Sequence, residues 1–352
     1  MRIGIPKEIK PLEGRVALIP DAVADLAHAG HEVHVQAGAG EASGFSDEAY
    51  VHAGAQVLPD AAAVYEKGQL IIKVKEPVGE ELDLLRRDHQ LFSFLHLAAL
   101  PDLTKKLCDI GLTAIAFETV QDRHGLPILA PMSNIAGRIA VQAGTHYLHS
   151  PSGGKGLMLG GLPGVERGKV VILGAGNAGS NAASLAAGMG AEVVVFDKQA
   201  HKLDAMMNMA SNITALYPYQ EALSCHVQQA DLLIGAVLIP GAKAPKIISR
   251  EQVCSMQAGS VIVDIAVDQG GCIETTRPTT YTTPVYTECG ALHFCVTNIP
   301  GAVPKTASIA LSASLLPYSL SLANGKWKDN AVLNAAVNVE NGSIVHPALI
   351  HH

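Results

Sequence analysis

The sequence is poor in aromatic residues and in charge. Aromatic residues make up 4% and charged residues 16% of the 352 residues, and acidic side chains outnumber basic ones by 32 to 25. A net negative chain with few aromatic rings is a poor candidate for coating nucleic acid or an anionic membrane. We therefore expect neither nucleic acid nor membrane among its partners.

The sequence also lacks clustered cysteines. Six are scattered along the chain without a CxxC pair, so neither a metal site nor a dense disulfide framework is expected. The opening segment MRIGIPKEIK has no apolar stretch typical of a secretory signal. Together these features predict a protein of a reducing compartment, the cytoplasm.

One run without charge, residues 306–325, approaches the length of a membrane span. It contains Pro317 and several serines, which are more typical of a half-buried helix in a soluble protein.

The length predicts two domains, and the hydrophobic pattern predicts an α/β fold. In the first third of the chain, short apolar runs alternate with helical patterns, as in a doubly wound parallel sheet. The expected strands are residues 2–5, 32–36, 70–74, 91–95 and 113–117, and the expected helices include residues 21–29, 80–87 and 102–110.

A second alternation begins at Lys169, with strands expected at residues 170–173, 192–196, 232–234 and 261–265. A helical pattern at residues 133–148, with a candidate cap at Ser133, precedes it, and the run from Thr306 follows it. We expect a discontinuous substrate domain of residues 1–129 and 306–352, a Rossmann domain of residues 130–305, and a cleft between the two doubly wound domains.

The segment after the strand at 170–173 has the pattern GxGxxG, formed by Gly174, Gly176 and Gly179. At the mouth of a helix, the first glycine makes a tight turn, the second lets a pyrophosphate approach, and the third lets helix and strand pack closely. The helix N-terminus then offers N–H groups to the phosphates. The pattern predicts a dinucleotide site.

Asp197 closes the next strand, 23 positions after Gly174. A carboxylate here accepts hydrogen bonds from the ribose hydroxyls and repels a 2′-phosphate, so NAD is favoured over NADP. The alternative is an ordinary acid at a strand end, with its charge blunted by Lys198.

Chemistry-bearing side chains follow several expected strands. Arg15, Lys75 and His96 lie after strands of the first domain, and Asp268 follows a strand of the second. Ligands of open parallel sheets bind at the carboxyl ends of the strands, so these four residues can converge on one ligand.

Each of the four has a structural alternative. Arg15 could form a surface ion pair with Glu13, Lys75 could cap a sheet edge, His96 could be a core histidine, and Asp268 could favour a turn.

Blocks along nearly the whole chain resemble the alanine dehydrogenase family. The resemblance rests on MRIGIPKEIK with Gly14–Val16, Lys73–Pro77, Phe94–Ala98, Ala130–Ser133, Gly174–Gly179, Gly235–Pro245, Val263–Gly271, Thr297–Pro300 and Val303–Thr306.

The resemblance implies reversible, NAD-dependent oxidative deamination of L-alanine to pyruvate and ammonium, in a homohexamer. It implies that Arg15 and Lys75 bind the substrate carboxylate, and that His96 and Asp268 are the catalytic acid–base residues. The cofactor contacts that it implies, beside the glycines, are Ser133, Asn177, Ala178, Asp197, Lys202, Val237, Leu238, Ile265, Ala266, Val267, Asp268, Val296, Thr297, Asn298 and Ile299.

Two other functions remain open on the sequence. One is the NAD-binding component of a proton-translocating transhydrogenase, which generally has Gln where Asp268 stands. The other is a catalytically silent NAD-binding regulator, which has no need of all four chemistry-bearing residues. An opine-type dehydrogenase is a third idea and requires a larger pocket. Preference among small amino acids depends on pocket volume, which a sequence does not give.

Overall fold

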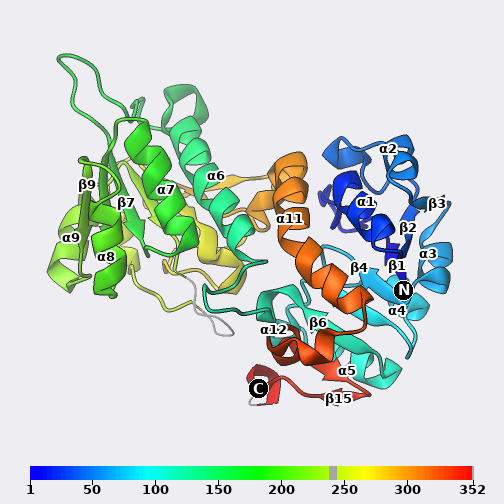
Figure 1. Ribbon diagram of the computed structural model, residues 1–352. Coiled ribbons are helices and arrows are strands. Elements are labelled where there is room, and N and C mark those ends of the chain that lie inside the picture. The colour runs from blue at the N-terminus through cyan, green and yellow to red at the C-terminus, as the bar shows by residue number, and fades with distance from the viewer. Residues whose placement is uncertain (238–243, 351–352) are drawn as a thin grey trace. The chain divides into compact units, whose positions relative to one another are not determined.

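The computed structural model describes residues 1–237 and 244–350 of the chain. The chain divides into two compact units, the first made of Met1–Met132 and Gly301–His352, the second of Ser133–Pro300. Each unit is an α/β fold with its own sheet (Figure 1).

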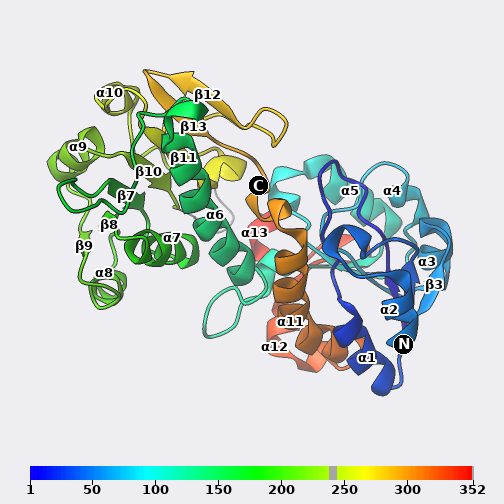
Figure 2. The same ribbon diagram turned by 90° about the horizontal axis from the view of Figure 1, so that it is seen from above.

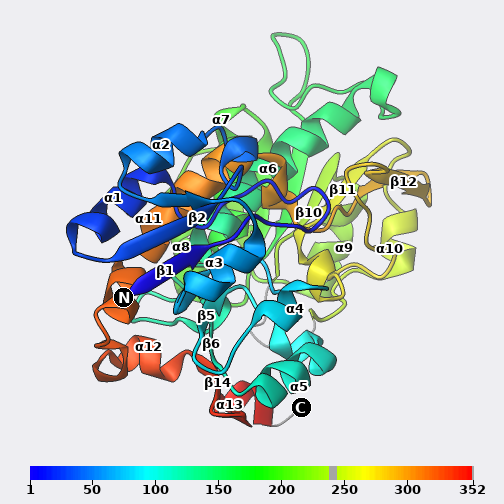
Figure 3. The ribbon, with the colours of Figure 1, turned by 90° about the vertical axis from the view of Figure 1, so that its right-hand side faces the viewer.

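The first unit contains a sheet of eight described strands in the order β15-β14-β6-β5-β4-β1-β2-β3. Strands β1 to β6 run parallel, and β14 and β15 extend the sheet antiparallel beside β6 (Figure 3). The strands are β1 (Arg2–Ile5), β2 (Glu32–Gln36), β3 (Gln56–Leu58), β4 (Leu70–Ile72), β5 (Gln90–Ser93), β6 (Thr113–Ala116), β14 (Val337–Glu340) and β15 (Ser343–Ile344).

The helices of the first unit are α1 (Pro20–His28), α2 (Asp47–His52), α3 (Ala61–Lys67), α4 (Glu81–Leu84), α5 (Pro101–Ile110), α11 (Pro304–Ala323), α12 (Ala331–Ala335) and α13 (Pro347–Ile350). Short 3-10 turns are η1 (Glu41–Ser43), η2 (Leu97–Ala99), η3 (Phe117–Thr119) and η7 (Trp327–Asp329).

The second unit contains a sheet of seven described strands in the order β12-β13-β11-β10-β7-β8-β9 (Figure 2). All pairs are parallel except β12 with β13. The strands are β7 (Lys169–Leu173), β8 (Glu192–Phe196), β9 (Ile213–Leu216), β10 (Leu232–Gly235), β11 (Val261–Asp264), β12 (Val285–Glu288) and β13 (Ala291–Phe294). The helices are α6 (Ala130–Leu148), α7 (Asn177–Gly188), α8 (Ala200–Met207), α9 (Gln220–Gln228) and α10 (Arg250–Cys254), with the turns η4 (Ser150–Ser152), η5 (Ile265–Gln269) and η6 (Ile299–Ala302).

The parallel strands of both units follow one topology. If each unit's parallel strands are numbered along the chain, their order is 3-2-1-4-5-6, the order of the doubly wound dinucleotide fold. The order reverses direction between β1 and β4 in the first unit, and between β7 and β10 in the second. The prediction of two doubly wound α/β units is confirmed, and each sheet in addition carries antiparallel strands at one edge.

The central strands are apolar on both sides, because helices cover both faces of a doubly wound sheet. Leu70, Ile71 and Ile72 of β4 are fully buried, as are Val170, Val171 and Ile172 of β7. This continuous apolar pattern explains why these strands could be predicted from the sequence.

Two expected helix boundaries are wrong. The helix expected at residues 80–87 ends at Leu84, because the next residues are held by tertiary contacts: the Arg86 guanidinium donates to the carbonyl oxygens of Tyr65 and Glu66. Helix α6 begins at Ala130, so Ser133 lies inside it and is not its cap. Pro131 fits the first turn because that turn needs no N–H donor.

Helix α11 is the one described helix long and apolar enough to cross a membrane by length and composition. Of its most apolar 18-residue stretch, 44% is buried. Its serines are bonded inside the first unit: the Ser308 hydroxyl accepts from Val16 N–H at 3.0 Å, and Ser312 accepts from Ile19 N–H at 3.1 Å. Helix α11 therefore holds the segment that leads from β1 to α1.

A single described disulfide joins Cys254 to Cys289 in the second unit. The other four cysteines are free. One disulfide does not make a dense framework. Neither of its two cysteines belongs to the buried core.

We expect Ser308→Ala to lower the free energy of unfolding by about 1–3 kcal/mol, because it leaves the buried Val16 N–H without its acceptor. Chemical denaturation measures the change. Ser314→Ala is the matched control, because the Ser314 hydroxyl bonds only within its own helix, to Ala310 O. Equal losses in both variants would contradict the role given to Ser308.

Candidate functional site

The loops that carry Arg15, Lys75 and His96 follow β1, β4 and β5, which are neighbours in the first sheet. All three strands are parallel, so the three loops leave the same edge of the sheet. This edge includes the point between β1 and β4 where the strand order reverses, the usual ligand position in such folds.

Arg15 is buried, 3% exposed, and is not part of a surface ion pair. Its guanidinium faces the Glu13 carboxylate in a forked arrangement, with Nε 2.7 Å from Oε1 and Nη2 against Oε2. The remaining nitrogen, Nη1, lies 3.3 Å from the sulfur of Met132. Glu13 thus fixes the plane of the guanidinium, which also lines a small hollow of about 100 Å³.

Lys75 lies three residues beyond β4, in a backbone segment held by Glu8. The Glu8 carboxylate accepts from Val74 N–H at 2.6 Å and from Lys75 N–H at 3.3 Å. Burial raises the pKa of Glu8, while the buried Lys73 ammonium, 3.4 Å from its Oε2, opposes the rise. Lys73 also contacts Glu81 at 3.0 Å. Lys73 is therefore the structural lysine of this strand, and Lys75 the partly exposed one.

His96 is exposed, so it is not a core histidine. Its backbone adopts a left-handed conformation, with φ 51° and ψ 35°. The Glu118 carboxylate accepts the N–H groups of both Leu95 and His96, the latter at 2.6 Å. The imidazole lies parallel to the ring of Phe94, with 6.0 Å between centroids.

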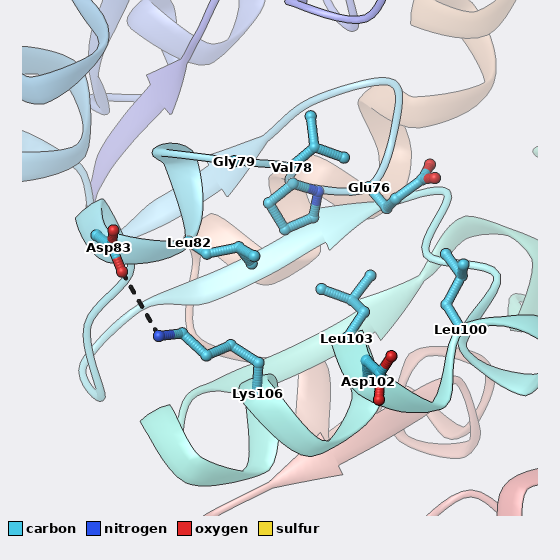
Figure 4. A pocket seen from close by; sticks show the side chains of 10 residues that line it. Glu76, Val78, Gly79, Leu82, Asp83, Leu100, Asp102, Leu103 and Lys106 are labelled. Carbon is cyan, nitrogen blue, oxygen red and sulfur yellow. Dashed lines mark hydrogen bonds and ion pairs between the residues drawn. The ribbon is translucent and has the colours of Figure 1, made fainter.

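A hollow in the first unit lies beside these loops but contains none of the three residues (Figure 4). It has a volume of about 440 Å³ and is lined by Pro77, Val78, Leu82, Leu100 and Leu103, with Glu76, Asp83, Asp102 and Lys106 around them. An ion pair joins Lys106 to Asp83 at 3.5 Å. Its mainly apolar lining does not suit a small zwitterion.

The glycine turn in the second unit has the geometry that the sequence predicts. Gly174 has φ 96°, a conformation that side chains disfavour, and a Cβ there would lie 2.8 Å from Ala236 O. A Cβ on Gly179 would lie 1.8 Å from Gly174 O, whereas one on Gly176 would meet nothing within 4 Å. The turn is therefore closed on the protein side and open at Gly176.

Helix α7 begins at Asn177 without a side-chain cap, since Gly176 is its N-cap residue. The first N–H groups of a helix have no partner within the helix and carry its positive dipole end. An open glycine beside an uncapped helix N-terminus fits a pyrophosphate.

Asp197 follows β8 directly and is already engaged with the turn. Its Oδ2 accepts from Ala175 N–H at 2.8 Å and its Oδ1 from Gln199 N–H at 2.9 Å. These bonds fix the carboxylate beside the glycine turn, and the lone pairs that remain suit ribose hydroxyl donors. Asp197 is thus more than an ordinary strand-end acid.

Asp268 is exposed on the 3-10 turn η5, which follows β11. The Asn298 N–H donates to Asp268 Oδ2 at 3.2 Å, and Asn298 itself is left-handed with φ 56°. The structure therefore brings the predicted catalytic acid of this unit together with a predicted cofactor residue.

The remaining predicted cofactor residues lie at several places in the second unit. Val237, Ile265–Asp268 and Val296–Ile299 follow β10, β11 and β13, neighbours in the sheet. Lys202 lies in α8 and Ser133 in the first turn of α6. Leu238 lies outside the described residues.

Sequence reasoning missed the carboxylates Glu8, Glu118 and Asp264, which hold these loops, and it named Glu13 only as a possible surface partner of Arg15. Asp264 is fully buried at the end of β11, and it accepts from the N–H groups of Ala266 and Cys272, both at 3.0 Å, and from the Thr276 hydroxyl at 2.7 Å. Burial raises the pKa of Asp264, whereas these hydrogen bonds act to lower it. An acid at the end of an apolar strand was the available signal.

No group of three or more His, Cys, Asp or Glu among residues 1–237 and 244–350 is arranged to hold a metal ion.

The fold and these residues define a class of protein: a two-unit α/β protein with a Rossmann unit for a pyridine dinucleotide. Two family models match the chain, the N-terminal domain of alanine dehydrogenase/PNT at residues 4–136 and the C-terminal domain at residues 140–347.

The chain is also similar to individual proteins over nearly its whole length. It is 48% identical over 357 residues to an alanine dehydrogenase of Methanococcus maripaludis, with 99% of this chain and 95% of the relative covered. A solved structure of an L-alanine dehydrogenase superposes with a TM-score of 0.96 at 47% identity, covering 100% of this chain and 98% of the other. A transhydrogenase structure from Sinorhizobium meliloti is more distant, with a TM-score of 0.86 and 27% identity over 99% of this chain and 100% of the other. The chain belongs to the alanine dehydrogenase/PNT family.

We expect Gly179→Ala to weaken NADH binding and to destabilise the fold by about 1–3 kcal/mol, because the new Cβ collides with Gly174 O. Fluorescence titration with NADH and chemical denaturation measure the two effects. Gly188→Ala in the same helix is the control: its Cβ meets nothing within 4 Å, so NADH affinity stays unchanged. If both variants bound NADH like the unchanged protein, the pyrophosphate site would not be at this turn.

Proposed function

We propose that Arg15, Lys75, His96 and Asp268 carry out the NAD-dependent, reversible oxidative deamination of L-alanine to pyruvate and ammonium. The observation that carries the proposal is the end-to-end likeness to alanine dehydrogenases, at 48% identity, together with loops that carry three of these residues after neighbouring strands. The chain is an oxidoreductase that acts on the CH–NH2 group.

NAD fits the glycine turn of the second unit. Gly176 leaves room for the pyrophosphate, the N-terminus of α7 supplies N–H groups, and Asp197 accepts from the ribose hydroxyls. A dinucleotide held there would supply the hydride acceptor, and the task of the protein's own residues is to bind and orient the substrate and to move protons. Residues 130–305 are the proposed NAD-binding domain, and residues 1–129 and 306–352 the proposed substrate domain.

Arg15 and Lys75 bind the substrate carboxylate. A guanidinium matches a carboxylate in plane and charge, and a second cation restricts its rotation. Glu13 orients the Arg15 guanidinium, and Glu8 fixes the backbone at Lys75, so the guanidinium and the backbone that carries the second cation are placed before the substrate arrives. Such preorganisation supports hydride transfer because it aims the Cα–H bond.

His96 and Asp268 move protons. Loss of hydride leaves an imine, which water attacks to form a carbinolamine, and its collapse releases ammonium and pyruvate. We assign to His96 the proton transfers at the substrate and carbinolamine oxygen, because imidazole gives and takes protons near neutral pH. We assign the amino group and the attacking water to Asp268.

We further propose a homohexamer that works in the cytoplasm. The family likeness supports the hexamer, and the scattered free cysteines support a reducing compartment, in which the Cys254–Cys289 pair would be reduced. Sedimentation equilibrium of the purified protein measures the number of subunits.

The first test is formation of NADH from L-alanine and NAD, and its reversal with pyruvate and ammonium. Purified protein should catalyse both, while His96→Ala and Asp268→Asn should each lower turnover by at least roughly 100-fold, because general acid–base catalysis is lost. Both variants should still bind NADH. A protein that binds NADH but never oxidises alanine would be a silent regulator or a transhydrogenase component, and a variant with full turnover would remove that residue from the mechanism.

The second test addresses the carboxylate. We expect Arg15→Ala to raise the Michaelis constant for pyruvate by at least about tenfold, because a charge-assisted hydrogen bond to the substrate is lost. Steady-state kinetics with NADH and ammonium at saturation measure it. Arg87→Ala, on the exposed surface of the same unit, is the control and should leave the constant unchanged. If the Michaelis constant for pyruvate is unchanged in both variants, Arg15 does not bind the substrate carboxylate.

A further inference from the structure

His96 has a backbone conformation that residues other than glycine rarely adopt. At φ 51° and ψ 35° it lies in the left-handed region, which costs free energy and persists only when surrounding contacts enforce it. The surrounding contact is the Glu118 carboxylate, which lies 2.6 Å from His96 N and 3.2–3.3 Å from Leu95 N.

Glu118 is itself rigidly placed. It belongs to η3, which continues β6, and β6 pairs with β5 up to Ser93 and Ala116. Its neighbour Phe117 is fully buried and packs edge-on against Phe92 and Phe94. The carboxylate is therefore presented from one strand to the loop that leaves the next strand.

The same aromatic cluster limits the imidazole. The Phe94 ring lies parallel to the imidazole, with an interplanar angle of 10° and 6.0 Å between centroids, and it also packs edge-on against Phe117, the residue before Glu118. The carboxylate fixes the backbone at His96, and the Phe94 ring restricts the side chain from one side.

We propose that Glu118 is a positioning residue for His96: its carboxylate accepts two successive backbone N–H groups and so holds the histidine in the left-handed conformation that aims the imidazole at the substrate. The proposal rests on the acid–base role of His96 proposed above. Glu118 acts through the backbone of His96, so the reach of its oxygen matters and its charge is secondary.

Two conservative variants separate reach from charge. Glu118→Gln keeps the length of the side chain and one acceptor oxygen but removes the charge. Glu118→Asp keeps the charge but withdraws the acceptor by about 1.5 Å, one carbon–carbon bond, out of reach of the two amides. If the charge matters, Glu118→Gln should lose more kcat than Glu118→Asp. If the reach of the oxygen matters, Glu118→Asp should lose more.

We expect kcat of Glu118→Asp to fall by roughly 100-fold, as for a misplaced catalytic group, with the Michaelis constant for pyruvate nearly unchanged. Glu118→Gln should retain kcat within about fivefold, since a neutral hydrogen bond replaces a charged one. Glu340→Gln, which removes a carboxylate paired with Lys328 in the same unit, is the control and should keep full kcat.

Thermal unfolding checks that each variant is folded. The proposal is overturned if Glu118→Asp keeps kcat, or if Glu118→Gln falls as far as Glu118→Asp. Should Glu118→Asp fail to fold, kcat of Glu118→Gln decides alone, because a role of the charge predicts a large loss and positioning predicts almost none.

Amide hydrogen exchange tests the same contact without the reaction. Peptides that cover Leu95 and His96 should exchange faster in Glu118→Asp than in the unchanged protein, and at the original rate in Glu118→Gln. If the protein failed to oxidise alanine, the proposed function would fall while this readout still decided whether Glu118 holds the loop. Unchanged exchange in Glu118→Asp overturns the positioning role.

Discussion

Both units depend on one interaction: the hydrogen bonds that carboxylates accept from backbone and guanidinium N–H groups. Where a parallel strand ends, its N–H groups lose their partners, and the chain must turn without leaving them unsatisfied. Glu8, Glu118 and Asp264 accept such N–H groups in three different loops, and Glu13 accepts from both the backbone and the side chain of Arg15. Each loop carries a residue to which we assign a part in the chemistry.

This arrangement has an energetic cost. Burial raises the pKa values of Glu8 and Asp264 above the ordinary values. The folded state thus binds their protons more tightly than the unfolded chain does, so this contribution favours folding at low pH and is lost as pH rises through the shifted pKa. At pH values above the shifted pKa the ionised carboxylates oppose stability and, in return, fix loop geometry.

The sequence predicted the parts of the fold that depend on local pattern. Strands β1, β2 and β8 have the expected bounds, because apolar runs between polar turns mark them. The glycine turn was equally visible, since its three glycines lie within six residues of one another. The loop-holding carboxylates were not, because Glu118 and His96 are 22 positions apart, and Glu8 and Val74 are 66 apart. Only the pairing of β1 with β4 and of β5 with β6 brings such residues together.

The two units offer different groups to an anion at the same point of the same topology. In the second unit only residues 174–176 separate β7 from α7, so the helix N-terminus itself stands at the sheet edge. In the first unit residues 6–19 separate β1 from α1, and α1 begins with Pro20, which has no N–H to offer. The N-terminus of α1 is therefore poorly suited to a phosphate. The long loop instead supplies Arg15, so in our proposal a side chain takes the place that backbone amides have in the other unit, and a small carboxylate is the anion that a guanidinium suits.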